Sequence, residues 1–157
     1  MIKFRSTTLD YFSKLYLDSS ALIKAFVPEQ GRGAVLDLLT RATIIATSRV
    51  TYVECRAALS RAKREGRLQA RGESLATRNL DDRWLQLQIV EFDDELTRNA
   101  GELARAHALR ALDAIHLASA GVIVEESLPE VTFACWDRRL WEAAESSGFR
   151  VAPERSP

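Results

Sequence analysis

The 157-residue sequence has little of what defines several large protein classes. Its only two cysteines, Cys55 and Cys135, lie far apart in apolar segments, which excludes a disulfide framework or CxxC zinc site and favours buried free thiols. No apolar run reaches the roughly 18 residues of a membrane span, and no signal-peptide core is visible, so we expect a cytoplasmic protein. Lys plus Arg and Asp plus Glu are balanced at 22 each, so any nucleic-acid binding must use a local basic patch.

The sequence does contain short β-branched runs that alternate with amphipathic segments. The predicted strands are 15–17, 43–46, 87–90, 131–135 and 149–151. The predicted helices are 19–27, 33–41, a helix capped by Ser48 and ending at 64, 68–85, 93–109, 111–126 and 138–147. This alternation indicates an α/β sandwich with a mostly parallel central sheet. A single domain is predicted over 15–152, between an N-terminal extension (1–14) and a C-terminal tail (153–157).

Four acidic residues stand in apolar or structured surroundings. Asp18 ends the run Leu15-Tyr16-Leu17, Glu54 lies in a helix start, Asp113 interrupts an apolar helix, and Asp137 follows a predicted strand. A carboxylate taken out of water is costly unless a cation compensates it. Parallel sheets collect functional groups beyond the carboxyl ends of their strands. We therefore expect the four to converge around a hard cation such as Mg²⁺ or Mn²⁺, which suits phosphodiester chemistry.

Each acid taken alone also has a plainer interpretation. Asp18 and Asp137 stand where helix N-caps are expected, and Glu54 suits a solvated first turn. Asp113 is the hardest to explain in that way, because Asp is a poor residue inside a helix. The conjunction of the four at predicted strand ends is the stronger signal.

Four segments resemble the motifs of the PIN-domain nucleases. LDSSALIK (17–24) is similar to the opening motif, and VE (53–54) with RAAL (56–59) to the second. LRALDAIHLA (109–118) closely resembles the third motif, which is the most specific, and ACWDRRL (134–140) resembles the fourth. The order of the motifs also fits, and the resemblance spans roughly 15–151. Length and the lack of appended domains look most like the VapC toxins of toxin–antitoxin pairs, so the fold implied is a three-layer α/β/α sandwich.

The resemblance implies that Asp18, Glu54, Asp113 and Asp137 hold one or two Mg²⁺ or Mn²⁺ ions for hydrolysis of RNA. Asp18 and Asp113 would be the main ligands, Glu54 would orient or deprotonate the attacking water, and Asp137 would complete the charge. A homodimer and a cognate antitoxin protein, silencing the enzyme from its groove, are implied as well. Cys135 departs from the pattern, since many relatives carry Thr or Ser there. A thiol donates a weaker hydrogen bond, which bears on an auxiliary contact and not on the carboxylate.

Residues that would contact substrate are weaker predictions. Ser19 would touch substrate or the water on the metal, or else cap the helix. Arg110 would reach a phosphate or remain a solvated charge. Arg61 and Arg64 belong to a basic segment, 56–71, that forms either a phosphate-binding wall or an ordinary charged hairpin.

Two further side chains have competing interpretations. His116 lies three residues after Asp113 on the same helical face, and a satisfied buried histidine is favoured over a catalytic one. Trp136, beside Asp137, is favoured as core or interface over a stacking platform for RNA bases.

Three functions stay open from the sequence. The leading one is a metal-dependent endoribonuclease acting as a toxin. The second is a PIN-fold nuclease of RNA processing outside a toxin system, and the third is a non-catalytic binding module, against which the presence of all four acids argues.

Overall fold

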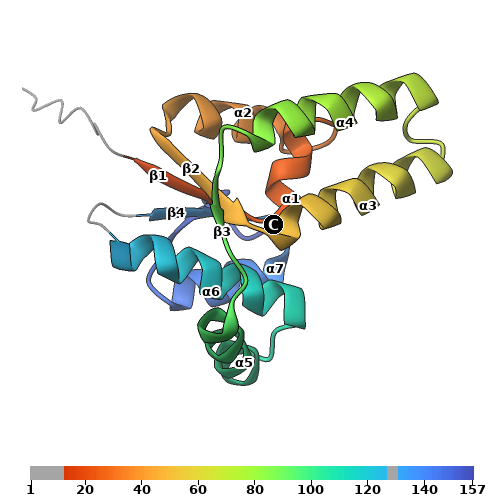
Figure 1. Cartoon of the computed structure of the whole chain (residues 1–157). Helices are drawn as coiled ribbons and strands as arrows, with labels where there is room; N and C mark the ends of the chain where they lie inside the picture. The colour runs from red at the N-terminus through yellow and green to blue at the C-terminus, as the bar shows by residue number, and fades with distance from the viewer. Residues whose placement is uncertain (1–12, 127–130) are drawn as a thin grey trace, which may run out of the picture.

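The computed structural model describes residues 13–126 and 131–157, so most of the predicted extension 1–14 lies outside the described residues (Figure 1). Five strands are present: β1 (Lys14–Leu17), β2 (Ile44–Ser48), β3 (Gln88–Val90), β4 (Val131–Ala134) and β5 (Arg150–Ala152). The helices are α1 (Ser19–Leu22), the 3₁₀ turn η1 (Ile23–Ala25), α2 (Arg32–Arg41), α3 (Val50–Arg64), α4 (Ala70–Trp84), α5 (Asp94–His107), α6 (Ala111–Glu126) and α7 (Arg138–Ser146).

The strands form one sheet in the order β3-β2-β1-β4-β5, and every pairing between neighbours is parallel. Helices α1 to α4 cover one face of the sheet, and α5 to α7 cover the other, so the predicted three-layer α/β/α sandwich is confirmed (Figure 1). The chain leaves β1 toward β2 and β3 on one side and later returns to place β4 and β5 on the other. The strand order therefore reverses between β1 and β4, which is where open α/β sheets bind ligands.

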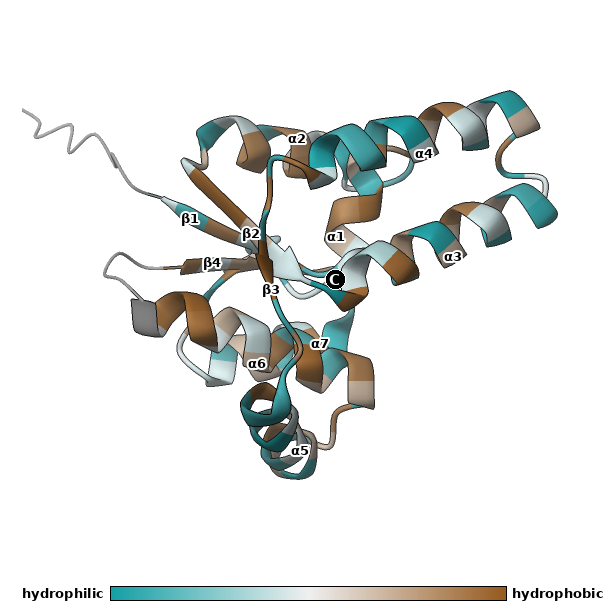
Figure 2. Ribbon diagram, viewed as in Figure 1, coloured by the Kyte–Doolittle hydropathy of each residue, from teal (hydrophilic) through white to brown (hydrophobic). Residues whose placement is uncertain are grey.

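Alternating side chains of the strands feed two separate cores. Leu15 and Leu17 point into the core beneath α1 to α4, whereas Tyr16 points into the core beneath α5 to α7. This alternation follows from the two-residue period of a strand. Figure 2 shows the result, with β2 and β4 strongly hydrophobic and α3 and α4 of mixed polarity along the hairpin that extends from the sheet.

No single helix within the described residues is long and apolar enough to cross a membrane. Only α5 and the segment Ala111–Val124 of α6 taken together, bent by 116° at their junction, match such a span in length and composition.

Two local predictions were wrong. Ser48 does not cap the following helix but ends β2, because its pairing with Val90 of β3 extends the strand to that point. Helix α3 then begins at Val50 without a side-chain cap. The predicted helix 19–27 is shorter, since α1 tightens into η1 and the last turn closes with a bond from the Phe26 amide to the Ile23 carbonyl ahead of Pro28.

Gly31 is the N-cap of α2 and packs against the indole of Trp136, which follows β4. Its φ of +91° lies in the left-handed region, where residues with a Cβ are disfavoured. A Cβ at this position would stand 2.7 Å from Nε1 of Trp136. The glycine thus permits both the turn and the close approach of the indole.

Gly31→Ala should lower the free energy of unfolding for two reasons: alanine is disfavoured in the left-handed region, and its Cβ would clash with Trp136. Gly148 has a φ of +93° and no atom near the added Cβ, so Gly148→Ala isolates the backbone cost, roughly 1 kcal/mol. The clash with Trp136 should add roughly 1–3 kcal/mol for Gly31→Ala. Urea denaturation of both variants measures the difference, and equal losses would contradict the packing assigned to Trp136.

Candidate active site

The first predicted acid, Asp18, lies at the carboxyl end of β1 and is almost fully buried. It is the N-cap of α1 and accepts a hydrogen bond of 2.8 Å from the Ala21 amide. The Ser20 hydroxyl lies 2.8 Å from both carboxylate oxygens. Burial raises the pKa of Asp18 to about 6, and the nearby Glu54 adds to the rise, while His116, Ser20 and Ala21 oppose it.

Ser20 connects this carboxylate to the neighbouring strand end. Its hydroxyl oxygen accepts a 2.7 Å hydrogen bond from the Trp136 amide while the hydroxyl proton points to Asp18. The Asp18 amide in turn donates to the Ala134 carbonyl at 3.2 Å. These bonds join the ends of β1 and β4 at the reversal of strand order. No local pattern in the sequence indicates this link, because Ser20 and Trp136 are 116 residues apart.

Glu54 reaches the same place from the fifth position of α3. Ser19, one of the predicted substrate contacts, donates to Glu54 Oε2 at 3.1 Å. His116 Nε2 lies 2.8 Å from Glu54 Oε1. The Glu54 side chain is 22% exposed, so its carboxylate is held on both oxygens while it still faces solvent.

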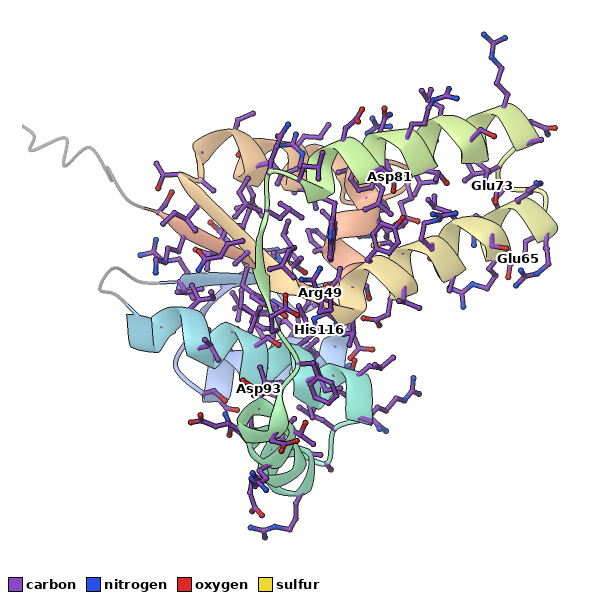
Figure 3. All side chains as sticks on the ribbon, viewed as in Figure 1. Arg49, Glu65, Glu73, Asp81, Asp93 and His116 are labelled. Atoms are coloured by element: carbon purple, nitrogen blue, oxygen red, sulfur yellow. The ribbon has the colours of Figure 1, made fainter. Side chains whose placement is uncertain are left out.

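His116 is buried, as the favoured interpretation predicted, yet it contacts the acidic cluster directly. Its Nδ1 lies 2.9 Å from the Tyr16 hydroxyl, and both rings belong to the interior beneath α6. Figure 3 shows His116 near the middle of the molecule, between α6 and the start of α3. Sequence reasoning missed Tyr16, because a tyrosine in a buried strand carries no signal of a polar partner.

The remaining two acids lie on the far side of this cluster. Asp113 is the third residue of α6 and partly buried, and Asp137 caps α7 by accepting from the Leu140 amide at 3.1 Å. Burial raises the pKa of Asp113. The carboxylates of Asp137 and Glu54 raise this pKa further, while His116 and Arg110 oppose the rise. Electrostatic interactions therefore link Asp18 with Glu54, and Asp113 with both Glu54 and Asp137.

A groove of about 640 Å³ opens beside Glu54, between α1, η1 and α3. Its charged lining is mostly basic: Lys24, Arg61, Arg64 and Arg67 face Glu29 and Glu54. Arg61 and Arg64 thus lie along a groove that includes Ser19, whereas Lys63 of the same basic segment pairs with Glu73 at 2.7 Å. Figure 3 shows Glu65 and Glu73 at the far end of the hairpin, away from the cluster. Arg110 is exposed and lies on the other side, near Asp113.

Trp136 is partly buried, lines the groove and has two neighbours against its indole. The Lys24 amine lies 5.2 Å from the ring centroid, and Gly31 packs against the indole. Lys24 is itself paired with Glu29 at 2.9 Å. The ring therefore supports the groove wall more than it offers a platform.

Cys135 is fully buried behind the acids. Its Sγ lies 3.7 Å from the Asp137 carbonyl oxygen, and burial raises the pKa of the thiol. The thiol contacts the backbone at Asp137 and leaves the carboxylate to the α7 cap.

The donor set suits a hard divalent cation. In the described ranges, 13–126 and 131–157, no three Asp, Glu, His or Cys side chains already stand in the arrangement of a metal site. Burial is the main cause of the raised pKa values of Asp18 and Asp113, and the carboxylate of Glu54 adds to both. Oxygen-rich sets of carboxylates match the preference of Mg²⁺ and Mn²⁺.

Comparison with known proteins agrees with this geometry. The PIN domain family model matches residues 15–133. Ribonuclease VapC45 of Mycobacterium tuberculosis is 40% identical over 139 residues, covering 88% of this chain and 94% of the relative. The chain belongs to the PIN-domain family, and among its members it is similar to the VapC ribonucleases.

Two solved structures share the fold. FitAcB from Neisseria gonorrhoeae superposes with a TM-score of 0.64 at 18% identity, covering 87% of this chain and 95% of that one. A toxin–antitoxin complex from Klebsiella pneumoniae gives a TM-score of 0.62 at 16% identity, covering 91% and 99%.

The buried Asp18 predicts a distinctive pH dependence of stability in the metal-free protein. Its folded-state pKa of about 6 exceeds the reference value of 3.8, so unfolding releases a proton between these values. The free energy of unfolding then falls as pH rises from about 4 to 6, and the loss is complete above the folded-state pKa. Asp18→Asn keeps an N-cap without a charge and should exceed the wild type in stability by on the order of 2 kcal/mol at pH 8, but not at pH 4.

Asp93→Asn is the matched control, since Asp93 caps α5 in solvent by the same bond, at 2.9 Å, to the Leu96 amide. Chemical denaturation from pH 4 to 8 in EDTA measures both differences. A gain for Asp18→Asn that does not grow with pH would contradict the cost assigned to the buried carboxylate.

Proposed function

We propose that the protein is a Mg²⁺- or Mn²⁺-dependent endoribonuclease that acts as the toxin of a toxin–antitoxin pair. The observation that carries the proposal is the meeting of Asp18, Glu54, Asp113 and Asp137, from four separate segments, at the reversal of strand order beside a basic groove. The 40% identity to a ribonuclease supports the same activity.

Each carboxylate has a distinct part in the proposed mechanism. Asp18 and Asp113 would be the main ligands of the cation, because they are the two acids whose burial disfavours the free anion. Glu54, held on both oxygens and facing solvent, orients or deprotonates the attacking water. Asp137 completes the negative charge from the start of α7. When bound, the cation supplies a lowered water pKa and neutralises charge that develops on the phosphoryl oxygens.

RNA would enter through the groove between α1 and α3. Arg61 and Arg64 would contact phosphates there, and Arg110 would do so on the side of Asp113. Phosphate contacts of this kind supply affinity and register without reading base sequence.

The proposal includes protein partners and a compartment. A cognate antitoxin would silence the enzyme by occupying the groove. The Klebsiella pneumoniae structure of the same fold is a toxin–antitoxin complex, which supports an antitoxin as partner. A homodimer and a cytoplasmic location complete the proposal.

Asp113→Asn should abolish metal-dependent cleavage while the protein stays folded. The amide retains the size of the side chain but loses the charge that the cation requires, so we expect a loss of roughly 100-fold or more. Cleavage of total RNA is followed with Mg²⁺, with Mn²⁺ and with EDTA. Asp94→Asn, at the exposed first turn of α5, is the control and should cleave as the wild type does. Near-normal cleavage by Asp113→Asn would contradict the assignment of Asp113 as a ligand of the cation.

Reversing Arg61 and Arg64 to Glu together should weaken RNA binding and flatten its salt dependence. Each lost phosphate contact removes roughly 0.7 from the slope of log K against log salt for a single strand. Binding is measured with a fluorescent RNA and Asp113→Asn as the background, so that nothing is cleaved. The control reverses Arg78 and Arg98, which are exposed on α4 and α5 and do not line the groove. An unchanged slope for the Arg61 and Arg64 variant would contradict the role of these residues in a phosphate-binding wall.

A further inference from the structure

A chain of buried hydrogen bonds leads from the sheet interior to the candidate active site. Tyr16, fully buried on β1, meets His116 Nδ1 at 2.9 Å, and His116 Nε2 meets Glu54 Oε1 at 2.8 Å. The imidazole is only 1% exposed, so water does not compete for either ring nitrogen. The two ring nitrogens of the buried imidazole therefore have Tyr16 and Glu54 as their hydrogen-bond partners.

The direction of these bonds follows from the phenol. A tyrosine phenol has an ordinary pKa of about 10, so the buried hydroxyl keeps its proton at neutral pH. We assign that proton to the hydrogen bond with Nδ1 of His116, which makes Nδ1 the unprotonated ring nitrogen. Nε2 consequently carries the hydrogen and donates it to Glu54.

Glu54 gains a fixed orientation from this arrangement. A glutamate side chain is flexible, and ordering it costs conformational entropy. Here Oε1 is held by His116 and Oε2 by the Ser19 hydroxyl at 3.1 Å. The carboxylate is preorganised before cation or RNA arrives, which is how buried partners of metal-site carboxylates act.

We propose that Tyr16 and His116 are positioning residues that hold the Glu54 carboxylate in its working orientation, with Tyr16 fixing the histidine as the Nε2–H tautomer. The proposal rests on the proposed function, since it deepens the role of Glu54 there. Neither residue touches substrate in this account, and both act through Glu54.

The first test removes one oxygen atom. Tyr16→Phe preserves the ring that stacks on Phe133 at 5.1 Å and deletes only the hydroxyl. We expect kcat for RNA cleavage to fall roughly 10- to 100-fold, with KM little changed, because groove contacts remain. The control is Tyr52→Phe, which removes an exposed hydroxyl bonded to Asp81 at 2.8 Å on the same helix as Glu54. Equal kcat values for Tyr16→Phe and wild type would overturn the proposal.

A double-mutant cycle separates positioning of Glu54 from general loosening of the core. In a Glu54→Gln background the Tyr16→Phe change should have no further effect on the residual rate, because the group it positions is already gone. If the two losses multiply, Tyr16 acts by another route and the proposal fails.

Two substitutions at His116 test which ring nitrogen donates to Glu54. Gln places an amide N–H where Nε2 stood and can still donate to Glu54, whereas Asn reaches only the Nδ1 position. His116→Gln should therefore cleave at least roughly 10-fold faster than His116→Asn. Equal activities, or a more active His116→Asn, would contradict the orientation assigned to the ring.

A spectroscopic readout needs neither metal nor RNA. The chain has two histidines, so nitrogen-15 shifts of His116 are assigned against His107 as internal reference. We expect the neutral Nε2–H form in wild type and a changed tautomer population in Tyr16→Phe alone. An Nδ1–H or doubly protonated ring would overturn the proposal. Absence of cleavage by the wild type would instead remove the proposed function, while this measurement still decides the hydrogen-bond chain.

Discussion

The burial of the Asp18 carboxylate is the constraint on which the rest of the site depends. A charge with almost no exposure at a strand end must be compensated, and the surrounding groups do so only in part, which leaves its pKa at about 6. Its hydrogen bonds to Ala21 and Ser20 also start α1 and join it to the end of β4. The same carboxylate therefore shapes the local backbone and creates the demand for a cation.

The parallel sheet explains how acids from distant segments meet. In the order β3-β2-β1-β4-β5, strands β2 and β3 lie on one side of β1, and β4 and β5 lie on the other. The strand order therefore reverses between β1 and β4, and ligands of open α/β sheets bind at such a reversal. Asp18 follows β1 directly and Asp137 is the third residue after β4, while α3 and α6 bring Glu54 and Asp113 from opposite faces of the sheet. The groove is basic on the α3 side, so a neutral chain still has a cationic surface beside its acidic site.

Sequence periodicity predicted the parallel α/β sandwich and most elements, while the three layers were implied by the family resemblance. It predicted α6 with the same bounds, because the apolar face of that segment is broad. It failed at Ser48, where pairing between strands overrode a local capping preference. The acids could be predicted because each interrupts or ends an apolar run. The links among them could not, since Tyr16 and His116 are 100 residues apart and Ser20 and Trp136 are 116 apart. Such contacts exist only once the sheet has formed, and no local pattern encodes them.

The most direct test of the account is thermal unfolding of wild type and Asp18→Asn at pH 8, each with and without Mn²⁺. Without metal the wild type should unfold at the lower temperature, because it carries the uncompensated charge. Saturating Mn²⁺ should reverse the order, since a ligand at 100 times its Kd stabilises the protein that binds it by about 2.7 kcal/mol. Equal shifts in both proteins, or no shift in the wild type, would contradict a cation site built around Asp18.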